Sequence, residues 1–296
     1  MVSALGLNHA VLNTVDLDRQ VAYYTDLVGL CLVERGSDHA YLATRSGADA
    51  LLLRRGQATA LTGLALLTHV DKSGEEIRRQ LADDGIAAEI RHDPHPGVAS
   101  SVVFIDLDGF EIELISDRRI HPASPSHGVA PLRIGHVARC VPDVARTCEF
   151  YGSVLGLKVA DRIGEHFVFM RTGVEHHTLN FIQSDRSRLH HIAFEMQDSA
   201  TLTSACDVLA QAERKVIWGP VRHGPGHNIA TYHINPEGQM IEFYAEMDRM
   251  TNEALGYYDP RPWHGDRPQR PKTWPAGQDI GIWGPGPPEG FLKQGV

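Results

Sequence analysis

The chain has 296 residues, 42% of them hydrophobic, and a formal net charge of -9 at pH 7. This hydrophobic content argues against intrinsic disorder, and the acidic balance argues against a nucleic-acid partner. The length is sufficient for two domains that each bury a core of their own.

Two features of the sequence bear on its compartment. No apolar run reaches the roughly 18 to 20 residues that a membrane-spanning helix requires, and the N-terminus has neither a basic segment nor a signal-peptide cleavage site. The four cysteines have no close paired spacing, which argues against both disulfides and a thiolate zinc site. We therefore expect a cytoplasmic protein with reduced cysteines and no membrane partner.

The first predicted elements form a strand, a helix and a second strand within residues 8–35. An apolar run is followed by positions at helical spacing, namely Leu17, Val21, Tyr24 and Leu27. Gly29 then marks the end of the helix, because glycine is favoured just after the last helical turn.

The second half repeats this order within residues 135–163. Its helical face carries Val144, Cys148, Tyr151 and Leu155, and Gly156 marks the stop. The two halves also close alike, with a strand, a tight turn ending in Gly, and another strand, from Phe104 in one half and from His233 in the other. We therefore expect one domain duplicated, with an offset near 128 residues.

The repeat divides the chain into an N-terminal domain at residues 1–124, a C-terminal domain at residues 132–248 and a C-terminal arm at residues 249–296. The linker is the aperiodic, Pro/Ser-rich segment 121–131. The arm is too rich in Pro and Gly for a helix or a central strand, yet it carries Trp263, Trp274 and Trp283. These aromatic residues predict an arm packed on the domains or on a neighbouring subunit, which favours a homo-oligomer.

Aligning the halves places three polar positions of the C-terminal domain opposite three of the N-terminal domain. His136 stands opposite His9, His191 opposite Gly63, and Glu242 opposite Glu113. Two imidazoles and one carboxylate form the facial ligand set of non-haem Fe(II) sites, which leaves positions open for substrate and oxygen. Since Gly63 has no donor atom, we expect a metal in the C-terminal domain and none in the N-terminal domain.

A single histidine or glutamate in a strand is more often a surface or hydrogen-bonded residue than a ligand. His191 and Glu242, however, both lie inside apolar strand runs, where an unpartnered polar group costs several kcal/mol. A bound metal would supply the missing partner.

The motifs IGHVARCVPD, EHHTLNF, LHHIAFE and RHGPGHNIATYHINPEGQMIEFY cover most of residues 134–246. On these motifs the second half resembles the catalytic domain of the type I extradiol dioxygenases, within the vicinal oxygen chelate superfamily. The resemblance implies an α+β fold with two domains, each built from a pair of βαβββ modules. It also implies Fe(II), with Mn(II) as the alternative metal, and a catecholic substrate that is cleaved with O2.

The resemblance further implies roles for individual residues. His136, His191 and Glu242 would be the metal ligands. His177 would act as the general acid, Tyr232 would hydrogen-bond a ring oxygen of the substrate, and His223 would help to hold the substrate. His176 is the alternative for the role of His177.

Three further histidines lie close to these motifs. We expect His176 and His190 to face outward or to lie behind the ligands, because they alternate with inward positions on strands. His227 lies in a Gly-rich loop, and we expect it to be solvated.

Two other functions remain open for this sequence. One is a different reaction on the same scaffold, such as a glyoxalase-like isomerisation or a transferase reaction; such relatives spread their ligands over two modules and do not need the His177 and Tyr232 pair. The other is a non-catalytic protein that binds a drug or an aromatic ligand, for which a ligand triad has no use.

Overall fold

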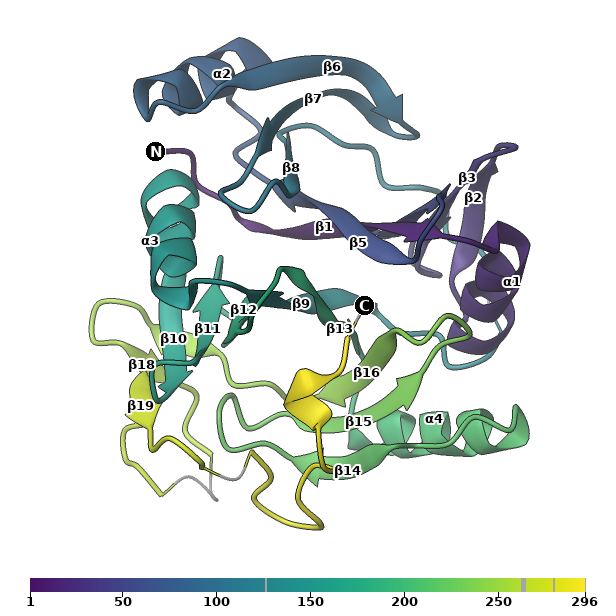
Figure 1. The fold of residues 1–296 in the computed structure, drawn as a ribbon, viewed down its shortest axis with the longest axis vertical. Coiled ribbons are helices and arrows are strands. Elements are labelled where there is room, and N and C mark those ends of the chain that lie inside the picture. Colours follow the sequence, from purple (N-terminus) through teal and green to yellow (C-terminus); the bar gives the residue numbers. More distant parts are fainter. Residues whose placement is uncertain (126, 262–264, 279, 296) are drawn as a thin grey trace.

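Two curled β-sheets, one from each half of the chain, lie one above the other (Figure 1). The computed structural model describes residues 1–125, 127–261, 265–278 and 280–295. The strand order is β2-β3-β4-β1-β5-β8-β7-β6 in the first sheet and β14-β15-β16-β13-β9-β12-β11-β10-β19 in the second. Apart from β19, the second sheet repeats the order of the first when it is read from β10, so the predicted duplication is confirmed.

Each half contains two βαβββ modules, which confirms the α+β prediction. The N-terminal modules consist of β1 (Gly6–Thr14), α1 (Leu17–Ala22), η1 (Tyr23–Val28), β2 (Cys31–Arg35), β3 (His39–Ala43) and β4 (Asp49–Arg55), then β5 (Ala60–Leu67), α2 (Gly74–Asp83), β6 (Ala88–His95), β7 (Val98–Ile105) and β8 (Glu111–Ile115).

The C-terminal modules have the same order of elements. They consist of β9 (Arg133–Val141), α3 (Val144–Leu155), β10 (Lys158–Ile163), β11 (Phe167–Arg171) and β12 (Leu179–Gln183), then β13 (Arg188–Glu195), α4 (Ser199–Gln211), β14 (Trp218–Arg222), β15 (Ile229–Ile234) and β16 (Met240–Ala245).

The first predicted helix differs from α3, its counterpart in the second half. The α-helix ends at Ala22 and continues as the π-helix η1, whereas α3 is α-helical throughout. The wider π turn brings both Tyr23 and Tyr24 to the buried side, while Val21, which the α-helical spacing places inside, is only half-buried. Gly29 ends the element in the left-handed conformation, with φ of 85°, as predicted.

The two closing hairpins share one turn chemistry. In the N-terminal domain the Asp106 carboxylate accepts from the backbone amides of Asp108 and Phe110. In the C-terminal domain the Asn235 side-chain oxygen accepts from the equivalent amides, those of Glu237 and Gln239. The turns fix the register of β8 and β16 against their neighbouring strands, and thus which of their side chains point into the curled sheet.

The domains share buried contacts. Strand β1 packs against β9, and one hydrophobic cluster contains residues of both halves. The Tyr23 hydroxyl lies 2.6 Å from Nε2 of His233, a hydrogen bond that joins η1 to β15. No helix among the described residues has the length and hydrophobicity to cross a bilayer.

The arm runs over the C-terminal domain (Figure 1). It contains β17 (Met250–Asn252), β18 (Tyr257–Tyr258), β19 (Lys272–Trp274) and η2 (Phe291–Lys293). Trp274 donates to the Asp161 carboxylate, so the predicted packing holds for this residue, whereas Trp283 is 45% exposed. Trp263 lies outside the described residues. All four cysteines are free thiols, as expected.

Candidate metal centre and catalytic site

The three predicted ligands come from three neighbouring strands of the second sheet. His136 lies on β9, His191 on β13 and Glu242 on β16, and Ala193 of the central strand pairs with both His136 and Glu242. Since side chains alternate along a strand, His191 points to the same face as Ala193. The three side chains therefore converge inside the curled sheet, as predicted.

Their geometry fits a divalent cation. Nε2 of His136 lies 3.2 Å from Nε2 of His191, and each of these atoms lies 3.1 Å from Oε2 of Glu242. Ligand bonds of about 2.1 Å at right angles would place donor atoms about 3 Å apart. When Nε2 of both imidazoles carries a lone pair, all three atoms can bind one cation, so the residues present fit a metal ion.

The protonation states also suit metal binding. Burial lowers the pKa of His136, which keeps this imidazole neutral. Desolvation by itself would raise the pKa of Glu242, but His136 and His191 together hold it well below its ordinary value. The Asn228 amide donates to the other carboxylate oxygen, Oε1, at 3.2 Å, and so leaves Oε2 directed at the two imidazoles.

The tautomer of His191 is set by a chain of hydrogen bonds from the arm. Burial lowers the pKa of His190 to about 3, so this ring is neutral. Its Nε2 lies 3.0 Å from the Phe291 carbonyl oxygen, which only accepts, so Nε2 carries the proton. His190 Nδ1 then accepts from Nδ1 of His191 at 2.7 Å, and His191 presents an unprotonated Nε2 to the metal position.

His177 lies beside the triad, with its ring centroid 4.3 Å from that of His136. Its Nδ1 lies 2.9 Å from Nδ1 of His176, whose Nε2 lies 3.2 Å from the Asp161 carboxylate. When each ring carries one proton, His176 keeps its proton on Nε2 facing Asp161, so its Nδ1 accepts from His177. Nε2 of His177 then keeps a lone pair, and burial lowers the pKa of this residue well below its ordinary value.

Tyr232 and His223 form the third part of the site. The Tyr232 hydroxyl lies 2.7 Å from Nε2 of His223, and both side chains are buried. Burial, and then the Glu242 carboxylate, raises the pKa of Tyr232 well above its ordinary value, so the phenol keeps its proton. Burial lowers the pKa of His223 to about 4.

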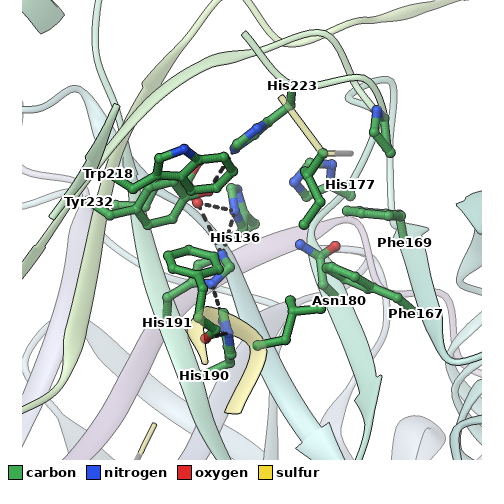
Figure 2. A pocket seen from close by; sticks show the side chains of 15 residues that line it. His136, Phe167, Phe169, His177, Asn180, His190, His191, Trp218, His223 and Tyr232 are labelled. Atoms are coloured by element: carbon green, nitrogen blue, oxygen red, sulfur yellow. Dashed lines mark hydrogen bonds and ion pairs between the residues drawn. The ribbon is translucent and has the colours of Figure 1, made fainter. Parts of the chain in front are cut away.

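These groups line one small, half-open cavity of about 30 Å³. Figure 2 shows Trp218 and Tyr232 on one side of the cavity and His177, Phe167 and Phe169 on the other. Phe291 and Leu292 of the arm and the nearby Ile280 complete the apolar wall. The structure thus brings all six predicted site residues together.

The other histidine expectations had mixed outcomes. His176 and His190 are buried behind His177 and His191, which agrees with a position behind the ligands. The expectation that His227 is solvated is wrong: its side chain is buried, and its Nδ1 lies 2.7 Å from Asp248, because the loop folds back beneath the arm.

Several residues that line or support the site were not predicted from the sequence, among them Asn228, Asp161 and Phe291. Asn228 belongs to a motif already quoted for the family, so its place there was a usable signal. Asp161 and Phe291 are remote from every motif, and nothing in their local sequence marks them. A further unpredicted residue, His95, lies outside this site, in the N-terminal domain, where its Nε2 is 3.1 Å from Oε1 of Glu113.

The comparisons with known proteins agree with this architecture. The family model described as "Glyoxalase/Bleomycin resistance protein/Dioxygenase superfamily" matches residues 6–114 and 133–243. A protein named Metapyrocatechase 2, from Cupriavidus necator, is 29% identical over 244 residues, which cover 73% of this chain and 70% of that protein.

Solved structures show the same fold. The Mn(II)-bound glyoxalase from Novosphingobium aromaticivorans has a TM-score of 0.85 at 22% identity and covers 99% of this chain and 95% of its own. The homoprotocatechuate 2,3-dioxygenase of Brevibacterium fuscum, solved with 3,4-dihydroxyphenylacetate, has a TM-score of 0.81 at 21% identity. The match covers 100% of this chain and 93% of that protein's chain.

Proposed function

The chain belongs to the glyoxalase/bleomycin resistance protein/dioxygenase superfamily, and from that premise we propose that it is an Fe(II)-dependent extradiol dioxygenase. It would cleave a catecholic ring next to the diol and incorporate both atoms of O2. One observation carries the proposal: the His136, His191 and Glu242 triad opens onto the same cavity as His177 and Tyr232. A cytoplasmic location and a homo-oligomeric state stay predictions.

Two imidazoles and a carboxylate would hold Fe(II), and Mn(II) is the alternative because this ligand set accepts both. When bound, the metal supplies a Lewis acid on which the catechol oxygens and dioxygen can be brought together. The Mn(II)-bound glyoxalase of this fold supports keeping both metals in the test.

His177 would move the proton of the substrate. Its Nε2 faces the cavity with a lone pair when each imidazole of the pair carries one proton, so it can take the proton from a catechol hydroxyl. The same nitrogen can return this proton to an oxygen atom as the ring opens. His176 would stabilise the protonated ring through their hydrogen bond, and the nearby Asp161 carboxylate would do so through its charge.

Tyr232 would donate its proton to a substrate oxygen on the opposite side of the cavity. Its raised pKa keeps the phenol protonated, and a hydrogen bond from His223 to the phenol oxygen would direct the Tyr232 proton inward. Together, Tyr232 and His177 would orient the diol between them.

The cavity wall favours uncharged substrates. Aromatic and aliphatic side chains form most of it, and no Lys or Arg lies among the described residues that line it. Burying a substituent carboxylate against such a wall, without a cation, costs several kcal/mol. We therefore propose a catechol that is unsubstituted or carries alkyl or aryl groups.

A glyoxalase-like isomerisation is the second candidate, favoured by the likeness to the Mn(II)-bound glyoxalase. The expected difference in ligand placement does not separate the two functions. His136 comes from the first module of its domain, and the other two ligands come from the second. The His177 and Tyr232 pair still favours the dioxygenase.

The test uses metal-free protein reconstituted anaerobically with Fe(II) or with Mn(II), then mixed with catechols in air. A dioxygenase consumes one O2 per catechol and produces a yellow ring-opened product, both of which are measured. An isomerase would convert a 2-oxoaldehyde–thiol adduct without oxygen uptake. A ligand-binding protein would do neither, and its metal content would be close to zero after anaerobic purification.

A further inference from the structure

We infer that the N-terminal domain holds a second divalent metal ion through His9, His95 and Glu113. One ligand atom from each of these residues lies within 4.8 Å of the other two. Their side chains are buried, with exposed fractions of 0%, 4% and 8%. Two imidazoles and a carboxylate are donors for first-row transition metals, so the inferred ion is of the Zn²⁺ or Mn²⁺ class.

Two of the three donors occupy the positions that bind metal in the other domain. Ala65 of β5 pairs with His9 on β1 and with Glu113 on β8, as Ala193 pairs with His136 and Glu242. The third position is Gly63, where a Cβ would lie only 3.2 Å from the backbone oxygen of Glu111. A side-chain donor therefore has to come from elsewhere.

His95, at the end of β6, provides that donor. The β6 and β7 ladder shifts register between His92 and His95, and this irregularity turns His95 inward. The His95 ring stacks on Tyr41, with centroids 5.1 Å apart and planes at 16°. Its Nε2 lies 3.1 Å from Oε1 of Glu113.

The hydrogen bonds of His9 leave its inner nitrogen free for a cation. The Asn8 amide nitrogen donates to Asp49, so the Asn8 oxygen faces Nδ1 of His9 at 2.7 Å. An amide oxygen only accepts, so the proton of His9 is on Nδ1 and Nε2 has a lone pair. This Nε2 is fully buried and has no hydrogen-bond partner among the residues that the structure describes.

A simple ion pair between His95 and Glu113 does not account for this arrangement, because it leaves Nε2 of His9 unpartnered. That atom lies 3.9 Å from Oε2 of Glu113, so a lone pair faces a carboxylate inside the protein. A cation between the three groups would offset this cost. It would also tie β1 and β8 to the β6–β7 hairpin, so we expect metal binding to stabilise this domain.

The cavity beside this cluster differs from the one in the C-terminal domain. Polar and charged side chains, among them Glu34, His39 and Arg54, line most of it. The described residues that line this cavity do not form an aromatic wall that could hold a catechol ring. We therefore assign the ion a structural role and not a second ring-cleavage reaction.

The test counts metal ions per chain. Chelator-treated protein is equilibrated with Zn²⁺, or in parallel with Co²⁺, then freed of unbound metal by gel filtration and measured by elemental analysis. We expect two ions in the wild-type chain, one in His191→Ala, one in His95→Ala and none in the double variant. His92→Ala removes an exposed imidazole of the same hairpin and should keep both ions.

Glu113→Gln serves as a second variant because it keeps the size of the side chain, and circular dichroism shows whether each variant folds. In the His191→Ala background, Zn²⁺ should raise the melting temperature, and Glu113→Gln should abolish that rise. One ion in the wild-type chain with none left in His191→Ala would overturn the inference. So would an unchanged count in both His95→Ala and Glu113→Gln.

Discussion

The Nδ1 atoms of His176 and His177 lie 2.9 Å apart, so an imidazole pair connects the cavity to the buried carboxylate of Asp161. His177 lines the cavity, and His176 lies behind it. In the proposed reaction His177 would lie beside the reacting atoms, and His176 and Asp161 would act through it.

His177→Ala should retain the metal and bind catechol but lose turnover. General acid–base groups contribute roughly 10²- to 10⁴-fold to a rate, so kcat should fall by about that factor. Oxygen uptake gives kcat, elemental analysis gives the metal content, and His69→Ala, an exposed histidine, is the matched control. A variant as fast as the wild type would rule out the proton-transfer role.

Asp161→Asn should act on the rate and not on binding. The amide can no longer stabilise a positive charge on the imidazole pair, so kcat should fall while KM changes little. The apparent pKa of the acidic limb of the kcat–pH profile should also shift, because the negative charge that favours protonation of the imidazole pair is lost. An effect confined to folding would lower the yield of active protein and leave that apparent pKa unchanged.

His190→Phe should weaken metal binding at the C-terminal site. The phenyl ring fills the space but cannot accept from Nδ1 of His191, so the ligand loses the partner that fixes its tautomer. Removing such a partner typically costs roughly 10- to 100-fold in metal affinity. Competition with a chelator measures the loss; an unchanged affinity would show that the Phe291 and His190 chain does not position His191.

Substrate charge should decide turnover more than substrate size does. We expect kcat/KM for alkyl- or aryl-substituted catechols to exceed that for 3,4-dihydroxyphenylacetate by about a hundredfold, which corresponds to about 2.7 kcal/mol of unpaired carboxylate burial. Uncharged 4-ethylcatechol controls for the bulk of the side chain. Equal values for the two would contradict the proposed apolar pocket.

The burial of His233, which contacts Tyr23, should make stability depend on pH. Burial lowers the pKa of His233 from 6.5 to about 3. Between these pH values the unfolded chain binds a proton that the folded chain excludes, so the free energy of unfolding decreases as the pH falls. One group contributes at most about 1.4 kcal/mol per pH unit.

His233→Gln keeps an acceptor for the Tyr23 hydroxyl but does not titrate. Its free energy of unfolding, measured by urea denaturation across this range, should depend less steeply on pH than that of the wild type. Other buried histidines affect both proteins alike, so the difference between the two slopes isolates His233. Parallel slopes would show that His233 does not titrate as proposed.

Patterns within the sequence were sufficient for the duplication and for the three ligand positions, whereas the paired βαβββ modules were implied by the family resemblance. The alternation of strands, the glycine stops and the two matching turns repeat at nearly constant offset, and this repetition fixes which positions share one face of each sheet. His136, His191 and Glu242 could be found for this reason. Each of them occupies a strand whose counterpart in the other half of the repeat marks the position, although the β9–β13 ladder shifts register beside His191.

Two of the residues that were missed, His95 and Phe291, lie where local pattern ends. A shift in strand register turns His95 inward, and an aperiodic arm brings Phe291 to His190. Both depend on how distant segments pack.

The sequence by itself determined the duplicated fold and the triad of the second domain, because period-two strands and tight turns are encoded by neighbouring residues. Only the tertiary structure decided which groups stand behind those ligands, how the arm closes the cavity, and that the first domain also gathers three donors. These features arise from side chains far apart in the chain, and they form only when packing brings them within hydrogen-bonding distance.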